Sequence, residues 1–487
     1  MQATADDPSL PDDVIADEQS GISEDWLAML VAGTILTGVL LVVMQFGERV
    51  EETIVHPLFG ERVEVSFAHP LQGWLAKPGE WDIDPLDGLT KWVGILAAAG
   101  VCFVVGMFAG RLRKRFRWST GSPSAFATGM AVVIALAMVA YIMAGQAVIK
   151  NASLSYALWA LVVGLLVSNT LGTPVWLRAA AMTEFYIKTG LVLFGAELLF
   201  GRLLAFGLPG VCIAWVVTPI VLITTFWFGQ RILKIESPTL NMVISADMSV
   251  CGVSAAVATS AACRAKKEEL SVAISLSLCF TVIMMIVLPL IIRATGMSTV
   301  VGGAWMGGTI DATGAVVAAG EMLDPVAAEV AAMIKMIQNI LIGVIAFGVA
   351  VYWTRYMESP AETSTRPRVG ISEVWRRFPR FIIGFMTASL LFSLLAGTGT
   401  VGEAAATSTT AFTKTLRGWF FCLAFVSIGL ETHFATLAKH VRGGKPIVLY
   451  IAGQSLNLCL TLTMAWVVFY WLFPDIVSTF EQLQPTE

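Results

Sequence analysis

Charged residues are scarce in this chain. Asp, Glu, Lys and Arg make up 14% of its 487 residues, whereas hydrophobic residues make up 56% and the mean hydropathy is +0.76. A soluble globular domain carries about 25% charged residues. The shortage of charge therefore argues against a soluble protein and against a nucleic-acid partner. It predicts an all-α polytopic membrane protein whose outer surface contacts lipid.

Histidine and paired cysteine are also scarce. Only four His residues occur, without an HExxH motif, and the seven Cys residues lie in or beside apolar segments without paired spacing. The sequence therefore argues against metal catalysis and against a disulfide framework. No nucleophile–base spacing is present either. We expect no enzymatic activity, no cofactor and no metal site, and we interpret the cysteines as reduced, apolar residues.

Positive charge is missing from the start of the chain, because no Lys or Arg precedes Arg49. Such an acidic start is typical of a disordered tail and not of a signal peptide, which would open with positive charge. The hydropathy pattern divides the rest into further regions. The predicted regions are a disordered acidic tail at 1–26, extra transmembrane helices at 27–150 with an extramembrane loop at 47–91, a transporter core of two inverted halves at 151–473, and a C-terminal tail at 474–487.

Eleven apolar runs have roughly the twenty residues that a membrane-spanning helix requires. Each should be helical, because hydrocarbon does not tolerate unpaired backbone groups. The runs lie at 27–46, 92–110, 123–147, 155–172, 183–204, 209–229, 269–292, 327–353, 379–397, 415–434 and 446–473.

Lys and Arg predict the orientation of these spans. The cluster RLRKRFR at 111–117 should be cytoplasmic, in the inner (plasma) membrane of a bacterium. About two thirds of the 31 Lys and Arg residues then fall on that side, provided that 239–263 and 297–320 each enter and leave on the same side. A full crossing of both weakens the bias only slightly. The sequence favours eleven crossings plus two broken or re-entrant segments, with thirteen crossings as the alternative.

The two exceptional segments are rich in small and hydroxylated residues, and each contains one acid. They read NMVISADMSVCGVSAAVATSAACRAKK at 241–267, with Asp247, and STVVGGAWMGGTIDATGAVVAAG at 298–320, with Asp311. Broken helices survive at membrane depth only where they are buried or line a wet cavity. Their N–H ends bind anions and their carbonyl ends bind cations. Close helix packing by small residues is the alternative, but intramembrane acids favour a functional site.

Candidate site residues follow from this interpretation. Lys335 lies about nine residues into its helix, too deep to reach the interface easily, so it can neutralise an anion or pair with an acid. Cys251 would fill a small gap without reacting. The predicted substrate-binding residues are Ser249, Cys251, Gly252, Ser254, Thr309, Thr313 and Lys335, and the predicted ion-coupling residues are Asp247, Asp311 and Glu197.

Glu197 belongs to a weak internal repeat. LLVSNTLGT at 165–173 is similar to LLFSLLAGT at 390–398, and FGAELLFGRL at 194–203 is similar to IGLETHFATL at 428–437. The two helices of the second pair run in opposite directions in the predicted topology, as in an inverted repeat that supports alternating access. Glu197 and Glu431 are equivalent, and solvation near a helix end is the alternative role for both.

Several motifs together resemble the bacterial YeiH family, whose members are named sulfate exporters. They are LVVGLLVSNT, KTGLVLFGAEL, SVCGVSAAVAT, GGTIDATGAVVAAG, AAMIKM and GLETHFATLAKHVRGGKPIVL, and the resemblance runs over 155–473. The family is similar to sodium–proton antiporters and bile-acid symporters. The resemblance implies two inverted halves, a panel domain beside a moving core, and a sulfur oxyanion as substrate.

This chain departs from the family pattern at two places. It reads TIDATGA at 309–315 where the family commonly has T-[IV]-H-E-V-A-Q, and Gln338 stands where the family often has Arg. The substrate or the coupling ion can therefore differ. We expect a secondary transporter of sulfate, sulfite or a small sulfonate, coupled to a proton or sodium, with a homodimer left open. The rivals are a sodium- or proton-coupled organic anion transporter and a membrane-embedded receptor or scaffold that uses the 47–91 loop and the acidic tail.

Overall fold

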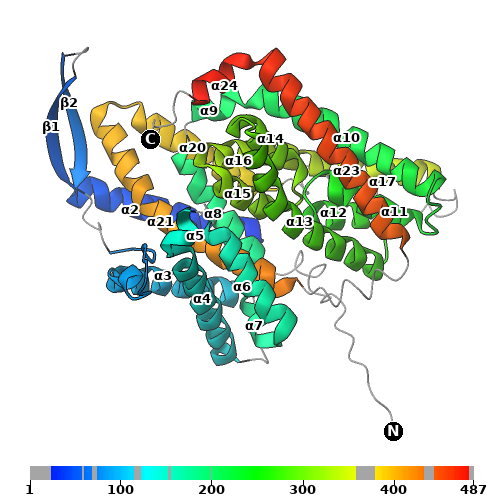
Figure 1. Cartoon of the computed structure of the whole chain (residues 1–487), viewed down its shortest axis with the longest axis horizontal. Coiled ribbons are helices and arrows are strands. Elements are labelled where there is room, and N and C mark those ends of the chain that lie inside the picture. The colour runs from blue at the N-terminus through cyan, green and yellow to red at the C-terminus, as the bar shows by residue number, and fades with distance from the viewer. Residues whose placement is uncertain are drawn as a thin grey trace, which may run out of the picture. The chain divides into compact units, whose positions relative to one another are not determined.

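The computed structural model describes residues 23–56, 60–68, 74–113, 122–151, 155–198, 200–357, 379–432 and 444–481, and most of them are helical (Figure 1). Residues 1–22 of the predicted tail and most of the basic cluster at 111–117 lie outside this part. Within it, eight helices are long and apolar enough to cross a membrane, namely Glu24–Phe46, Trp92–Leu112, Pro123–Gly145, Gly207–Arg231, Lys267–Thr295, Pro325–Met357, Thr400–Glu431 and Lys445–Leu472. The prediction of an all-α polytopic membrane protein is confirmed.

The described residues form two compact units. Unit 1 comprises 205–379 and 432–487, and unit 2 comprises 22–204 and 380–431, each within the described ranges. The helices of the predicted extra region 27–150 therefore belong to unit 2, together with parts of the predicted core. Each unit is built from chain segments far apart in sequence.

Unit 2 contains the following elements: α2 (Glu24–Phe46), β1 (Glu48–His56), β2 (Gly60–Ala68), η1 (Asp87–Leu89), α3 (Trp92–Leu112), α4 (Pro123–Gly145), α5 (Ala147–Asn151), α6 (Tyr156–Thr170), α7 (Val175–Ala180), α8 (Thr183–Glu197), most of α9 (Phe200–Ala205), α20 (Phe381–Ala396) and α21 (Thr400–Glu431). The loop predicted at 47–91 holds an antiparallel pair, β1 and β2, in register from Glu48↔Ala68 to His56↔Gly60. The span predicted at 415–434 starts earlier, at Thr400, because Ala and Glu in its first turns favour helix.

Two glycines related by the internal repeat make equivalent close approaches in unit 2. Gly195 of α8 packs against the backbone of α20, where an added Cβ would lie 3.0 Å from the Cα of Phe385. Gly429 of α21 packs against α6, where an added Cβ would lie 2.7 Å from the Cα of Gly164. Each glycine-bearing helix thus pairs with the first helix of the other half. The predicted inverted repeat would produce such an exchange.

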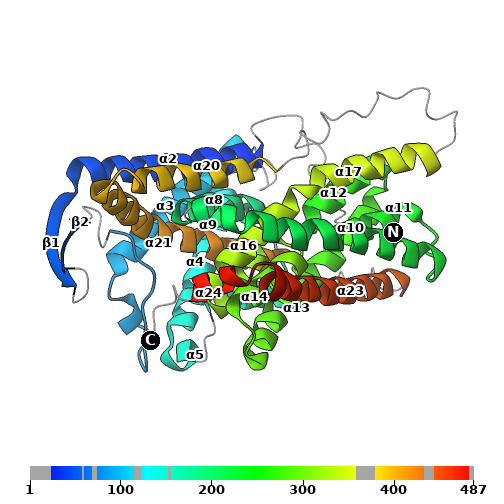
Figure 2. The same cartoon turned by 90° about the horizontal axis from the view of Figure 1, so that it is seen from above.

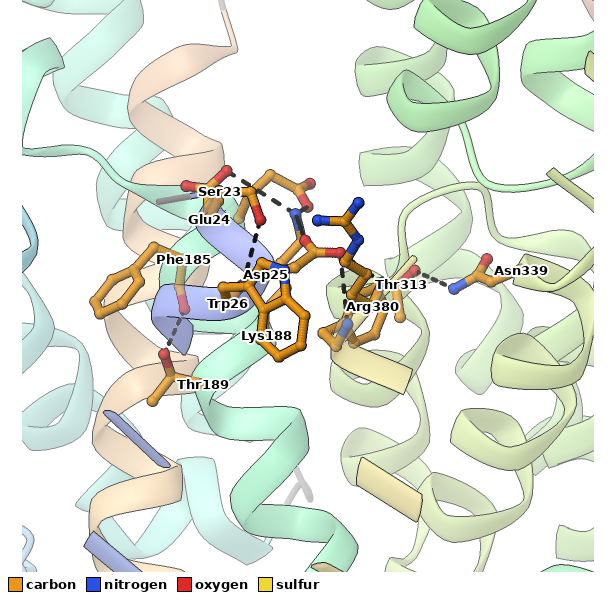
Figure 3. A network of polar contacts seen from close by, with 12 residues as sticks. Ser23, Glu24, Asp25, Trp26, Phe185, Lys188, Thr189, Thr313, Asn339 and Arg380 are labelled. Carbon is orange, nitrogen blue, oxygen red and sulfur yellow. Dashed lines mark hydrogen bonds and ion pairs between the residues drawn. The ribbon is translucent and has the colours of Figure 1, made fainter. Parts of the chain in front are cut away.

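A polar network fixes the start of α2 in unit 2 (Figure 3). Asp25 Oδ1 lies 2.9 Å from Lys188 Nζ of α8, and its Oδ2 accepts the backbone N–H of Arg380 at 2.7 Å, at the start of α20. Asp25 therefore caps a helix from a distant part of the chain. Figure 2 shows α2 running alongside α20, as this contact requires.

Unit 1 contains the two exceptional segments, and both are interrupted as predicted. Its elements are α10 (Gly207–Arg231), α11 (Pro238–Ser249), α12 (Val253–Cys263), α13 (Lys267–Thr295), α14 (Thr299–Thr309), α15 (Thr313–Leu323), α16 (Pro325–Asn339), α17 (Leu341–Tyr352), η3 (Trp353–Met357), α23 (Lys445–Val467), η5 (Val468–Leu472) and α24 (Pro474–Glu481).

The first segment, α11 and α12, turns back on itself and is called hairpin 1 below. Ser237 caps the start of α11, and its hydroxyl donates to Glu269 Oε1 at 2.5 Å. Thr239, in the first turn of α11, donates to Glu269 Oε2 at 2.8 Å. Glu269 lies in the first turn of α13, a few residues after α12 ends at Cys263. The two ends of the segment therefore meet, as a re-entrant segment requires.

The second segment, α14 and α15, turns back at the other end of α13 and is called hairpin 2 below. Arg293, in the last turn of α13, donates to the carbonyl of Met322 near the end of α15 at 2.9 Å. Hairpin 2 also begins here, at Thr299. An arm of 11 or 12 residues is about 16–18 Å long, roughly half the thickness of a hydrocarbon core. Each hairpin can therefore place its tip near the middle of a membrane.

Candidate functional site

The tips of the two hairpins touch. Tip 1 is Val250–Gly252 and tip 2 is Ile310–Ala312. A Cβ added to Gly252 would lie 3.3 Å from the Cβ of Asp311 and 2.8 Å from the hydroxyl of Ser277 on α13. Gly252 also has φ +65°, a backbone conformation that glycine adopts without strain. Glycine is therefore required here both by the turn and by the close approach.

The carbonyl end of α11 is covered by side-chain donors. Lys335 Nζ of α16 donates to the carbonyl of Val250 at 2.5 Å and to Gln338 Oε1 at 2.8 Å. Gln338 Nε2 donates in turn to the carbonyl of Ser249 at 3.1 Å. Asn457 of α23 donates to the carbonyl of Met248 at 3.3 Å. The last carbonyls of this half-helix, which lack helical partners, are thus satisfied from two neighbouring helices.

The carbonyl end of α14 is covered in the same way. Gln338 Nε2 also reaches the carbonyl of Gly308 at 3.2 Å, and Gln454 Nε2 of α23 donates to the carbonyl of Thr309 at 2.9 Å. Gln338 therefore joins the carbonyl ends of α11 and α14. Helices α16 and α23 supply every side-chain donor found on these carbonyls in the described part of the chain.

The N–H ends of the other two half-helices are open. Helix α12 starts after Gly252 and α15 starts after Ala312, and no side chain caps either start. Ser254 is exposed, and Ala312 and Thr313 are partly exposed, whereas the residues on the carbonyl side of the tips are buried. The first N–H groups of a helix have no helical acceptor and carry partial positive charge. Backbone N–H donors are therefore accessible at the starts of α12 and α15, whereas the carbonyl acceptors at the ends of α11 and α14 are covered.

Three charged groups lie buried around the tips. Asp247 is 0% exposed, and Asp311 and Lys335 are each 1% exposed. The Tyr450 hydroxyl donates to Asp311 Oδ2, and the Ser277 hydroxyl lies beside both carboxyl groups. In the described part of the chain, neither oxygen of Asp247 makes a hydrogen bond of regular geometry, and Oδ1 of Asp311 makes none. The acids are close enough to repel each other when both are ionised.

The profile of a protein family described as Conserved hypothetical protein 698 matches residues 128–450, which cover most of both units. The chain belongs to this family. Its relatives include the UPF0324 membrane protein RB9488 of Rhodopirellula baltica, 58% identical over 83% of this chain and 73% of that protein. A UPF0324 membrane protein of Nitratidesulfovibrio vulgaris is 52% identical over 79% of this chain and 65% of its own length. UPF0324 membrane protein NE0724 of Nitrosomonas europaea is 30% identical over 66% of this chain and 70% of that protein.

These comparisons agree with the resemblance to the YeiH family and with a location in a membrane, as the relatives' names and the eight long apolar helices indicate. The chain spans about two thirds to three quarters of the length of these relatives. No solved structure matches the chain.

Within this family member, the predicted substrate residues fall into two groups. Gly252, Ser254 and Thr313 lie at the open N–H ends, and Thr313 accepts a hydrogen bond from Asn339 at 3.1 Å (Figure 3). Ser249 and Thr309 are buried at the covered carbonyl ends, where their hydroxyls donate to Ala246 and Trp305 of their own helices. Cys251 is buried in tip 1, and Lys335 lies beneath that tip.

The predicted coupling residues are divided between the units. Asp247 and Asp311 come together at the tips in unit 1. Glu197 lies in unit 2, where its Oε1 is 2.9 Å from Nε of Arg417, whose guanidinium stacks 4.6 Å from the ring centre of Phe194. Glu431, its equivalent in the repeat, accepts a hydrogen bond from Thr183 at 3.0 Å. Glu197 thus has a local ionic partner, and its part in coupling stays a prediction.

Sequence reasoning missed the polar face of α23. Tyr450, Gln454, Asn457 and Thr461 are buried in a run whose hydropathy predicts only an apolar span. Their spacing of four, three and four residues places them on one side of a helix. This periodic stripe of polar residues in a membrane helix was the signal that could have revealed it.

Proposed function

We propose that this protein is a secondary active transporter that moves a small anion across the plasma membrane of a bacterium, with the hairpin tips as its binding site. The observation that carries the proposal is the asymmetry of the tips. The carbonyl ends are covered by Lys335, Gln338, Gln454 and Asn457, whereas the N–H ends at Gly252 and Ala312 are uncapped. A ligand that approaches the tips therefore meets hydrogen-bond donors.

Such ends suit an oxyanion. Helix N-termini hold phosphate, sulfate and carboxylate groups through their free N–H groups and partial positive charge. Gly252 itself is buried against Ser277 and Asp311, so the donors that a ligand can meet at this end are the N–H groups that follow it and the exposed Ser254 hydroxyl. The buried ammonium of Lys335 adds a full positive charge beneath tip 1. These groups offset the cost of moving an anion out of water.

The arrangement of the hairpins supports transport rather than static binding. They enter from opposite ends of α13 and meet at their tips, so that one site can face either side of a membrane when the unit moves. The exchanged glycine contacts of unit 2 fit two inverted halves, which commonly underlie alternating access. The sulfur oxyanion class rests on the resemblance to the YeiH family, and the names of the relatives specify no substrate.

Counterflow in proteoliposomes tests this proposal. Vesicles preloaded with unlabelled sulfate, sulfite or methanesulfonate receive the labelled ion outside, without any other gradient. We expect labelled anion to accumulate transiently in vesicles that contain the protein and not in protein-free vesicles. Absence of exchange for every anion tested, with correctly folded protein, would instead favour a receptor or scaffold.

A further inference from the structure

The carbonyl ends of α11 and α14 are covered by side chains of the protein itself. Val250, Ser249, Met248, Gly308 and Thr309 each offer a carbonyl that accepts a hydrogen bond from a side chain of α16 or α23. In transporters with broken helices, such carbonyls are where a coupling sodium ion is held. We infer that the ammonium of Lys335 is a resident substitute for that cation, so that anion transport is coupled to protons on Asp247 and Asp311 and does not require sodium. This inference rests on the proposed function.

The geometry at Lys335 is that of a coordinated cation. Its Nζ lies 2.5 Å from the carbonyl oxygen of Val250 and 2.8 Å from Oε1 of Gln338, and the side chain is 1% exposed. A sodium ion would need these same oxygens, because hard cations bind carbonyl and carboxylate oxygens. In the described part of the chain Lys335 makes no ion pair within 4 Å, and its charge acts both on the tip carbonyl and on the nearby Asp311 carboxyl group.

The acids are the remaining groups that can exchange an ion. Both oxygens of Asp247 and Oδ1 of Asp311 lack a regular hydrogen bond in the described residues, so each carboxyl group can accept a proton without breaking one. The groups that face them are Tyr450 from α23, Lys335 from α16, Ser277 from α13 and each acid itself, while Cys251 faces Lys335.

Charge balance then couples the anion to protons. With both acids ionised, the buried cluster carries one net negative charge, and an incoming anion would increase it in a medium of low dielectric constant. With both acids protonated, Lys335 alone remains charged, and a monovalent anion neutralises it. Anion binding should therefore draw protons from water onto the carboxyl oxygens. When the anion is released on the other side, the carboxyl groups return those protons to water there. The anion and the protons therefore cross the membrane in the same direction.

Proton uptake by the purified protein tests the inference directly. Sulfate or methanesulfonate, neither of which exchanges protons near neutral pH, is added as its choline salt to wild-type protein in weakly buffered, sodium-free solution that contains a pH indicator, and binding is followed in parallel by thermal shift. We expect binding with proton uptake, unchanged when sodium salts replace choline salts. Binding that requires sodium, or binding without proton uptake, would overturn the inference. Absence of any binding would instead count against the proposed anion site.

Lys335→Ala provides a second test. Removing the ammonium exposes the carbonyl of Val250 next to two acids, so we expect the thermal stability of the variant to rise with sodium concentration, unlike that of the wild type. Lys445→Ala is the matched control, because Lys445 donates to the carbonyl of Lys234 at 3.1 Å in an exposed position away from the tips. A folded Lys335→Ala protein that responds to sodium no more than Lys445→Ala contradicts the inference.

Discussion

The hydroxyl of Tyr450 donates a hydrogen bond to Oδ2 of Asp311, and thereby ties tip 2 to α23 across 139 residues of chain. The other oxygen of Asp311 has no hydrogen bond in the described part of the protein. One side of the carboxyl group therefore fixes its position, while the other stays available for a proton. A coupling residue needs both properties, because its carboxyl group must change charge while its position stays fixed.

Replacement of Asp311 should separate transport from folding. Asp311→Asn keeps the size of the side chain and can still accept from Tyr450, but it cannot exchange a proton. We expect gradient-driven accumulation in proteoliposomes to be abolished, with an unchanged gel-filtration profile. Tyr450→Phe removes a hydrogen bond worth about 0.5–1.5 kcal/mol but keeps the acid, so accumulation should be reduced without being abolished, with lower thermal stability. Normal accumulation by Asp311→Asn would show that Asp311 does not couple.

An acid placed at an open N–H end should compete with the substrate. Ala312 precedes α15 with φ −83° and ψ 129°, the extended conformation of an N-cap residue. Ala312→Asp would cap α15 with its own carboxylate and add negative charge beside Asp311, so we expect anion binding to be lost. Ala312→Ser caps without charge, so it should weaken binding less while stability rises by about 0.5–2 kcal/mol. The measurement is ligand-induced thermal shift, and full binding by Ala312→Asp would contradict an anion site at α15.

The residues of tip 1 should respond unequally. The exposed hydroxyl of Ser254 is available to a ligand, so Ser254→Ala should weaken anion binding by a few-fold without changing stability, as for loss of one hydrogen bond. Cys251→Ala should be tolerated. Gly252→Val should lose both binding and stability, because φ is positive and Ser277 and Asp311 are close. Isothermal titration and thermal unfolding separate these effects, and unchanged affinity in Ser254→Ala would remove that hydroxyl from the site.

The hairpins predict a labelling pattern. Because both ends of hairpin 1 meet at Glu269, Leu233→Cys and Lys266→Cys should react with a membrane-impermeant thiol reagent from the same side. Thr295→Cys, at the far end of α13, should react from the opposite side. The native cysteines are replaced beforehand as background. Labelling of positions 233 and 266 from opposite faces would show that the segment crosses fully.

The network at the start of α2 should contribute to the stability of unit 2. Asp25→Ala removes both the ion pair with Lys188 and the cap of α20, so we expect a loss of about 1–3 kcal/mol in thermal or denaturant unfolding. Asp25→Asn retains an oxygen for the N–H of Arg380 and should lose less. Equal losses for the two variants would show that the charge, and not the cap, holds α2 in place.

The sequence by itself determined the class of fold and the places where it is interrupted. Long apolar runs must be helices in lipid, and small residues with one acid each marked the two breaks, because these signals are local. The depth of Lys335 could be counted along its own helix. The sequence also identified Gly195 and Gly429 as equivalents, although not the contacts that they make.

Only the tertiary structure decided how the breaks are used. The hydroxyls of Ser249 and Thr309 donate to carbonyls of their own helices and do not face a ligand. Their orientation depends on how the chain turns at each tip, which cannot be read from the residue types alone. The covering of the carbonyl ends by Gln454 and Asn457 joins segments separated by 145 and 209 residues. Such contacts arise from packing between helices that are distant in sequence. This packing buries the last carbonyls of a half-helix, which then need a side-chain donor from a neighbouring helix. The same packing leaves the N–H ends open, and the proposed anion site follows from that difference.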